Sequence, residues 1–237
     1  MIHLYGMGSP NVVKVFIMLE ETGLPYRYTR VNVMAGEQFR SDFLALNPNA
    51  KVPVIVDENV AGDNRVVFES GAILSYLAEK TGVLWPGSFH QRTEVNQWLM
   101  FQMASFGPMA GQAIHFAHAV KDQEYGRNRY GNELARLINV VETRLAACPF
   151  MAGDAYSLAD IALHPWIRTL RMFFPEQLAG QAALTDWCER IMQRPAVDRA
   201  VSRVQAMSDQ DIADIRNADK AARDRYFNRV PRQPANR

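Results

Sequence analysis

The sequence predicts an α/β domain with a mixed sheet, followed by an all-helical domain. Over residues 1–82, short segments of alternating polarity and amphipathic segments with helical spacing follow one another. Over residues 91–207, apolar residues recur only at helical spacing. Between the two, Trp85-Pro86-Gly87 marks a break in composition that is typical of a linker. Residues 208–237 are polar, and we expect a C-terminal extension that is either a loosely packed helix or partly disordered.

The elements of the first domain follow from local signals. Ser9 and Pro10 are the pair expected at the N-cap and first turn of a helix, and Gly23 is expected to end it. The expected elements, in chain order, are a strand at 2–5, a helix from Pro10 with Val12, Val15, Phe16 and Leu19 on one face, a strand at 26–33, a short helix at 37–46, a hairpin through Ala61-Gly62-Asp63-Asn64, and a helix opening at Ser70. This order predicts an open mixed sheet of the thioredoxin type.

The second domain is expected to contain at least five helices. Ser157-Leu158-Ala159-Asp160 has the spacing of a capping box at the start of a buried helix. The other expected helices are one that carries Val95, Trp98, Leu99 and Gln102, one at about 124–147, one at 183–192 and one at 196–207.

Composition excludes several classes of protein. The 237 residues are 48% hydrophobic and 22% charged, with a net charge of +1, so nothing favours nucleic-acid or membrane partners. Cys148 and Cys188 are too few for a disulfide framework or a metal cluster, and we expect a reducing cytoplasm. There is no apparent signal peptide, and no apolar run approaches the ~18 residues of a membrane span. Gly6-x-Gly8 lacks the third glycine of a dinucleotide fingerprint, so no nucleotide cofactor is expected.

The stretch around Val52-Pro53 predicts a binding site. Proline cannot donate a hydrogen bond within a sheet, and a cis-proline at the strand entrance would turn the backbone of Val52 outward for an extended ligand. Ser70 opens a helix, and the N-terminus of a helix attracts a carboxylate. We therefore expect a peptide-sized thiol along the strand, with an acidic end on the helix.

Three blocks of sequence carry a family resemblance. Asn47-Pro48-x-x-Lys51-Val52-Pro53-Val54-Ile55, followed by Phe68-Glu69-Ser70-Gly71-Ala72-Ile73, resembles the glutathione-binding half of the cytosolic glutathione S-transferases. Residues 107–116, Gly-Pro-Met-Ala-Gly-Gln-Ala-Ile-His-Phe, resemble the narrower Nu class of bacterial disulfide-bond reductases and their yeast prion relative. The resemblance covers roughly residues 1–205 and implies glutathione as the cosubstrate.

A catalyst of this kind must hold the glutathione thiol as a thiolate. The free thiol has a pKa near ~8.5, and hydrogen-bond donors at a helix N-terminus lower it. Ser9 and Asn11 are the right residue types for this role, although Ser9 as a plain N-cap and Asn11 as an exposed residue are the alternatives. The Nu class usually has threonine at the Ser9 position, so serine is a departure that keeps the hydroxyl. Neither Cys148 nor Cys188 lies in the loop before this helix, so bound glutathione is the only reactive thiol expected.

The resemblance also implies the binding residues. Val52, next to Pro53, would pair with the cysteinyl unit of glutathione through its main chain. Glu69 and Ser70 would hold the γ-glutamyl amine and carboxylate. Lys51 and Gln38 would reach the glycyl carboxylate, and the alternative for both is a solvated surface.

Two further groups are interpreted as follows. His115 and His118 lie three residues apart, but no third ligand has a fitting spacing, so packing or pocket lining is expected rather than a metal site. Transferases of this family are usually two-fold homodimers, and the resemblance places an arginine from the partner's helical domain at the site. Arg129 is the best match, with Arg127 and Arg136 as alternatives.

The expected activity is glutathione-dependent reduction of small disulfides, and of peroxides, or conjugation of glutathione to electrophiles. The alternative is a regulatory protein of the same fold that binds glutathione with little turnover, as the yeast relative illustrates. The presence of both Ser9 and Asn11 favours the enzyme.

Overall fold

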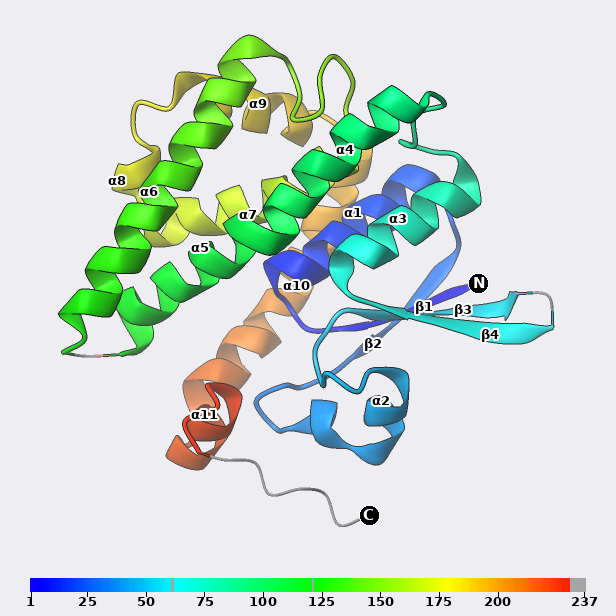
Figure 1. The fold of residues 1–237 in the computed structure, drawn as a ribbon. Helices are drawn as coiled ribbons and strands as arrows, with labels where there is room; N and C mark the ends of the chain where they lie inside the picture. Colours follow the sequence, from blue (N-terminus) through cyan, green and yellow to red (C-terminus); the bar gives the residue numbers. More distant parts are fainter. Residues whose placement is uncertain (61, 121, 231–237) are drawn as a thin grey trace.

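The computed structural model describes residues 1–60, 62–120 and 122–230 (Figure 1). Its sheet has four strands in the order β2-β1-β3-β4. The strand β1 (Ile2–Gly6) pairs in parallel with β2 (Tyr26–Arg30) and antiparallel with β3 (Val54–Val60), which in turn pairs antiparallel with β4 (Asp63–Phe68). This mixed sheet confirms the predicted fold class of the first domain.

Some predicted boundaries in this domain are wrong by a few residues. The strand β2 ends at Arg30 rather than at residue 33, because its partner strand has already ended at Gly6, opposite Arg30. The helix expected at 37–46 is split into a 3-10 turn (Glu37–Phe39) and α2 (Ser41–Leu46), since Arg40 between them has an extended backbone. The hairpin is present, although Ala61 of its turn lies outside the described residues.

Helix α1 (Pro10–Thr22) lies at the centre of the molecule (Figure 1). Ser9 is its N-cap and Gly23 ends it in a left-handed conformation with φ of 66°, as predicted. Every residue from 12 to 19 is buried, because α1 packs against α3 (Ser70–Thr81) and against two helices of the C-terminal half. The sequence predicted that only one face of α1 would be buried, but the helix is buried on all sides over residues 12–19.

The helical part begins after residues 82–88, which link α3 to α4 (Phe89–Phe101). The domain limits at 82 and 91 themselves stay a prediction. The helices that follow are π-helical Gln102–Phe106, α5 (Gly107–Ile114), π-helical His115–Ala119, α6 (Glu124–Ala147), α7 (Leu158–Phe173), α8 (Pro175–Leu178) and α9 (Ala182–Met192). Ser157 and Asp160 form the predicted capping box at the start of α7. The buried Asp160 also accepts hydrogen bonds from Met151 N at 2.8 Å and from Trp187 Nε1 at 2.9 Å.

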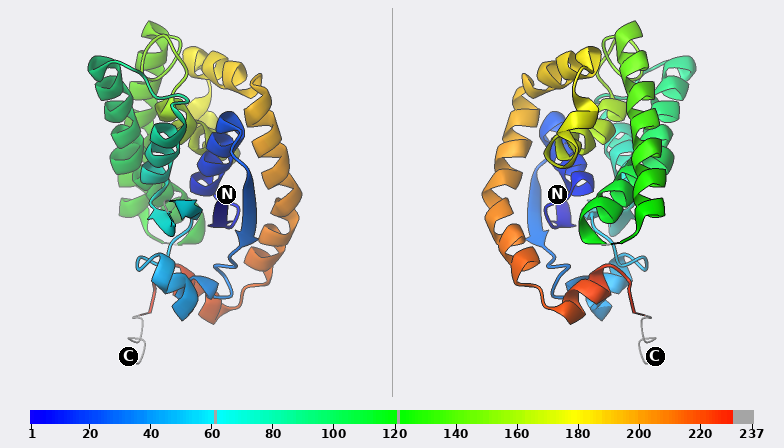
Figure 2. Two further views of the ribbon diagram at one scale, coloured as in Figure 1. Left: turned by 90° about the vertical axis from the view of Figure 1, so that its right-hand side faces the viewer. Right: turned by 90° about the vertical axis from the view of Figure 1, so that its left-hand side faces the viewer.

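The last two helices of the described residues are α10 (Pro195–Asn217) and α11 (Lys220–Tyr226). The sequence predicted that the last helix would end at Met207, but α10 continues through Ser208, where the polar extension was expected to begin. Figure 2 shows α10 curving along the side of the α/β domain, and Arg30 of β2 bonds to Asp211 of α10 at 2.8 Å. This partly buried ion pair anchors the polar C-terminal half of α10 to β2. Within the described ranges, no helix has the length and apolar character needed to cross a membrane.

Candidate active site

A cleft of about 560 Å³ lies at the N-terminus of α1, between the α/β domain and the helical part. Its lining includes the predicted site residues Ser9, Asn11, Gln38, Lys51 and Val52. They come from the first turn of α1, from the loop after β2 and from the loop before β3. The tertiary structure therefore brings together residues that are up to about forty positions apart in the chain.

Ser9 and Asn11 are both available as hydrogen-bond donors. The Ser9 hydroxyl oxygen accepts a long bond of 3.4 Å from Val12 N, so its own O–H is left to donate. Trp166 of α7 donates its Nε1–H to Asn11 Oδ1 at 3.0 Å, which orients the amide and leaves Nδ2 as the donor. Ser9 is thus an N-cap and a cleft residue at once. Together with the positive end of α1, these two donors form a suitable place for a thiolate.

The peptide bond between Val52 and Pro53 is cis, as predicted. Asn47 Nδ2 donates to Lys51 O at 2.8 Å and holds the loop that leads into it. Pro53 is buried, whereas Val52 and Lys51 line the cleft. This loop therefore forms one wall of the cleft.

Gln38 is buried at the edge of the cleft. Its Nε2 donates to Val33 O at 3.0 Å, and its Oε1 is buried without a hydrogen-bond partner among the described residues. A carboxylate needs donors, and the amide nitrogen of Gln38 carries two N–H groups, of which Val33 O accepts one. The role of Gln38 toward the glycyl carboxylate stays a prediction.

Glu69 and Ser70 stand slightly apart from the other predicted residues. Among the described residues, they are not part of the cleft wall. Glu69 is the N-cap of α3, with φ of 66°, and Asn49 Nδ2 lies 3.5 Å from its carboxylate. Ser70 is buried; its Oγ accepts from Lys14 Nζ at 3.2 Å and donates to Met103 Sδ at 3.5 Å. The free amide groups of the first turn of α3, rather than the Ser70 hydroxyl, are thus the groups left for a ligand carboxylate.

Lys14 is a residue that the sequence interpretation missed. It is fully buried in α1, and its Nζ donates to Gln102 Oε1 at 2.6 Å as well as to Ser70 Oγ, with Met103 Sδ at 3.5 Å. Burial lowers the pKa of Lys14 to about 7, while the charge of Glu69 opposes this shift. Lys14 thereby links α1 to the start of α3 and to the helical part. The sequence did contain an indication that Lys14 is unusual, since it is the one charged residue within the apolar run 12–19.

Two family models match the chain: the glutathione S-transferase N-terminal domain over residues 1–79 and the C-terminal domain over residues 108–195. The disulfide-bond oxidoreductase YfcG of Escherichia coli is 42% identical over 208 residues, covering 86% of this chain and 96% of that protein. The chain belongs to the glutathione S-transferase family. The predicted family and the predicted two-part fold are thus confirmed.

Solved structures of other glutathione S-transferase family members support the same conclusion. A glutathione transferase from Burkholderia graminis, with two glutathione molecules bound per subunit, is 44% identical. It covers 84% of this chain and 86% of its own, with a TM-score of 0.78. Ure2p in complex with glutathione is 30% identical, covering 84% of this chain and 97% of its own, with a TM-score of 0.76.

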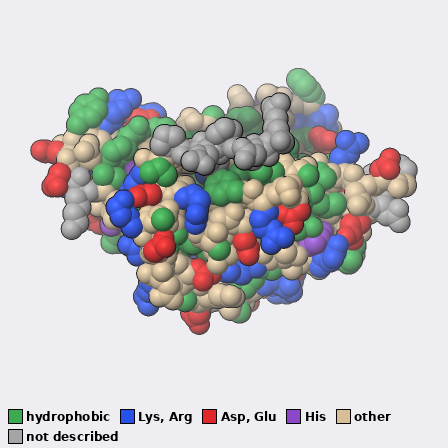
Figure 3. Space-filling view, turned by 90° about the horizontal axis from the view of Figure 1, so that it is seen from below, with side chains coloured by type: hydrophobic (Ala, Val, Ile, Leu, Met, Phe, Trp, Pro, Cys, Tyr) green, Lys and Arg blue, Asp and Glu red, His purple; other side chains and the backbone are tan. Residues whose placement is uncertain are grey.

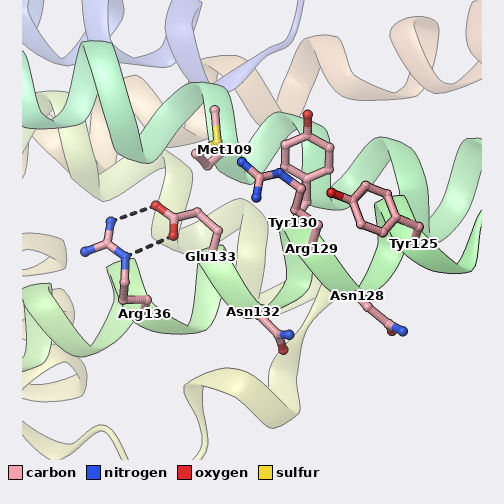
Figure 4. A pocket seen from close by; sticks show the side chains of 8 residues that line it. All are labelled: Met109, Tyr125, Asn128, Arg129, Tyr130, Asn132, Glu133 and Arg136. Carbon is pink, nitrogen blue, oxygen red and sulfur yellow. Dashed lines mark hydrogen bonds and ion pairs between the residues drawn. The ribbon is translucent and has the colours of Figure 1, made fainter.

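Arg129 lies away from the cleft of this transferase. It lines a separate cavity of about 550 Å³ on α6, together with Met109 of α5 and Glu133 (Figure 4). Arg136 is bonded to Glu133 at 2.7 and 2.9 Å, whereas Arg129 is exposed and makes no ion pair with the described residues. Within one chain, Arg129 and Ser9 are therefore not brought together.

The histidines and cysteines of this transferase lie in different surroundings. Among the described residues, no three His, Cys, Asp or Glu side chains are grouped to hold a metal ion. The ring of His115 lines the cleft, and that of His118 packs against Phe173 at 5.1 Å. Cys148 and Cys188 are free thiols, neither of them in the cleft, and burial raises the pKa of Cys188 to about 11.

The cleft has one more wall that the sequence did not indicate. Ile215 of α10, with Tyr226, Phe227 and Asn228 at the end of α11, lines it beside Ser9. These residues follow the end of the family match at residue 195, and no motif in the chain marks them as site residues.

Proposed function

We propose that this chain binds glutathione in the cleft and uses it as its only reactive thiol, chiefly to reduce small disulfides. The observation that carries the proposal is the pair of donors, Ser9 and Asn11, at the N-terminus of α1 in the same cleft as Val52. A charged sulfur beside these groups is stabilised by hydrogen bonds and by the helix dipole. The names of relatives such as the oxidoreductase YfcG support the same activity.

The proposed reaction needs no protein thiol. The bound thiolate attacks one sulfur of a disulfide, so that a mixed disulfide forms and the other half leaves as a thiolate that takes up a proton. A second glutathione then attacks the mixed disulfide at the glutathione sulfur. Two glutathione molecules are oxidised to one glutathione disulfide, while the substrate disulfide is reduced to two thiols. The same thiolate serves for reduction of peroxides and for attack on an electrophile.

The test is the reduction of hydroxyethyl disulfide by glutathione, followed through glutathione reductase. Turnover well above the uncatalysed rate is the expected result. The second candidate function is a regulatory protein that binds glutathione, a reading that the similarity to Ure2p supports. Calorimetric binding of glutathione without turnover on disulfides, peroxides or electrophiles would favour this second function.

Replacing Cys148 and Cys188 together by alanine is expected to leave glutathione-dependent activity largely intact, because neither thiol lies in the cleft. The loss of packing around the buried Cys188 is expected to lower the free energy of unfolding by about 1–3 kcal/mol. The rate of disulfide reduction and a denaturant titration of the same sample measure the two effects. A folded double variant without activity would show that a protein thiol takes part.

The active unit in the proposal is a homodimer, in which the partner's helical domain completes each cleft. Arg129 suits this role, because it is exposed and without an ion pair among the described residues, and a guanidinium binds a carboxylate through two parallel bonds. We also propose that the first domain ends at residue 82 and that the helical domain begins at residue 91. A cytoplasmic location belongs to the same proposal, and the free thiols of Cys148 and Cys188 support it.

Arg129→Ala is expected to weaken the binding of glutathione disulfide about tenfold without dissociating the dimer, because a charge-assisted bond to a carboxylate is lost. Calorimetry measures the affinity, and ultracentrifugation the oligomeric state. Arg136→Ala is the matched control, since its guanidinium is bonded to Glu133. A dimeric Arg129→Ala variant with unchanged affinity would remove this residue from the site.

A further inference from the structure

A carboxylate of the long helix α10 reaches the loop that carries Ser9. Asp211 accepts a hydrogen bond from Gly8 N at 2.6 Å through Oδ2, although the two residues are 203 positions apart in the chain. The other oxygen, Oδ1, accepts from Arg30 Nε at 2.8 Å and lies 2.6 Å from Nη2 of the same guanidinium. Gly8 directly precedes Ser9, the N-cap of α1, and both residues line the cleft. Helix α10 is therefore bonded to the backbone next to a predicted donor to the thiolate.

Asp211 differs from the charged residues of the surface. Figure 3 shows acidic and basic side chains mixed over the lower face of the molecule, where α2 and α11 lie, and exposed ion pairs contribute little. Asp211, by contrast, is 4% exposed. A buried carboxylate needs partners for its oxygens, and Gly8 and Arg30 supply them. The loop at Gly8 and the helix α10 thus hold each other in one arrangement.

The contact between Gly8 and Asp211 leaves no room for a side chain at position 8. A Cβ atom on Gly8 would lie 2.5 Å from Asp211 Oδ2, closer than Cβ atoms come to other atoms in folded proteins. The three atoms nearest to that Cβ all belong to Asp211. The φ of Gly8 lies outside the left-handed region, so the close approach of the carboxylate, and not the backbone conformation, requires glycine here.

The two predicted donors to the thiolate are held by different helices of the C-terminal half. Trp166 of α7 orients the Asn11 amide. The Ser9 hydroxyl oxygen accepts one backbone bond of 3.4 Å, which is too long to fix the hydroxyl firmly. The place of Ser9 therefore depends on its backbone, which α1 holds on one side and Asp211, through Gly8, holds on the other.

We propose that Asp211 is a positioning residue for Ser9: it holds the backbone at Gly8 so that the Ser9 hydroxyl faces the glutathione sulfur. This role rests on the proposed function and adds to it a residue outside the described lining of the cleft. The carboxylate acts through geometry rather than through its charge. A negative charge near the cleft disfavours a thiolate, and the guanidinium of Arg30 offsets that charge.

The two possible effects of Asp211 have opposite signs, so a single variant separates them. Asp211→Asn keeps the size of the side chain, but one oxygen becomes an NH₂ donor, so the amide cannot accept from both Gly8 and Arg30. We expect the pKa of the bound glutathione thiol to rise by about 1 unit, because the bond from Ser9 is weakened. Loss of the negative charge alone would lower this pKa.

The ultraviolet absorbance of the thiolate, titrated against pH at saturating glutathione, measures the pKa in the full chain. Calorimetry with S-methylglutathione, which has no thiol, is expected to show unchanged affinity. Asp214→Asn is the matched control, because Asp214 also joins α10 to the α/β domain, through Asn32 Nδ2 at 2.9 Å and through Arg30. A denaturant titration is expected to show that both variants are destabilised, but only Asp211→Asn should change the thiol pKa.

Two further variants test the route through Ser9. Gly8→Ala displaces the carboxylate without removing it, is expected to raise the thiol pKa in the same direction, and replaces Asp211→Asn if that variant does not fold. In a Ser9→Ala background, Asp211→Asn is expected to add no further rise.

A thiol pKa that is unchanged or lowered in folded Asp211→Asn, or that rises as much in the Ser9→Ala background, would overturn the positioning role and leave the proposed function intact. A wild-type chain that binds neither glutathione nor S-methylglutathione would overturn the proposed function, and the role of Asp211 with it.

Discussion

Replacing Ser9 or Asn11 by alanine is expected to raise the pKa of the bound glutathione thiol by about 1–2 units. Each change removes one hydrogen bond to a charged sulfur, and such bonds contribute about 1–3 kcal/mol. The double variant is expected to show the larger shift, since only the amide groups and the dipole of α1 remain. The ultraviolet absorbance of the thiolate, titrated against pH in the presence of saturating glutathione, measures the effect.

Ser88→Ala is the matched control for Ser9→Ala. Ser88 is the N-cap of α4 and accepts from Gln91 N at 3.2 Å, away from the cleft. Both alanine variants are expected to lose about 1 kcal/mol of stability through the lost cap, but only Ser9→Ala should change the thiol pKa. Ser9→Thr keeps the hydroxyl and should retain the wild-type value. A wild-type titration curve in both Ser9→Ala and Asn11→Ala would show that other groups stabilise the thiolate.

Lys14→Met is expected to change how the free energy of unfolding depends on pH. Burial lowers the pKa of Lys14 to about 7 in the folded chain, whereas the unfolded value is about 10.4. Between these values the unfolded state binds more protons, so stability contributed by Lys14 rises with pH. Relative to Lys14→Met, the wild type is therefore expected to gain about 1.4 kcal/mol per pH unit from about pH 7 to about pH 10.

Denaturant titrations of wild type and Lys14→Met at several pH values measure this difference. Lys220→Met is the control for the loss of a lysine, since the Lys220 side chain is 91% exposed. Below pH 7, two opposed effects decide whether Lys14→Met raises or lowers the free energy of unfolding. Removing a buried charge stabilises the fold, but Gln102 and Ser70 lose their donor. A difference between wild type and Lys14→Met that does not vary from pH 6 to pH 10 would mean that Lys14 keeps its proton throughout.

The sequence by itself determined the features that depend on neighbours in the chain. Ser9 and Pro10 begin α1, and Ser157 and Asp160 form the capping box of α7, because a cap needs only residues within one turn. The cis peptide before Pro53 was predicted for a similar reason, since proline is incompatible with the interior of a sheet. The family resemblance rests on these same short blocks.

Only the tertiary structure decided how distant segments meet. The pattern of α1 predicted one apolar face, but the helix is enclosed by both domains, so Lys14 is buried and bonded to Ser70 and Gln102. The polar residues after Met207 carry no apolar stripe that would predict a long helix. Of the two expected alternatives, a loosely packed helix or partial disorder, the structure shows helix over much of the described part. Asp211 holds it through Gly8 and Arg30, about 200 and 180 positions earlier in the chain. Charge pairing between segments so far apart in the chain leaves no local signal in the sequence. The sequence therefore did not predict that Tyr226 and Phe227 line the cleft.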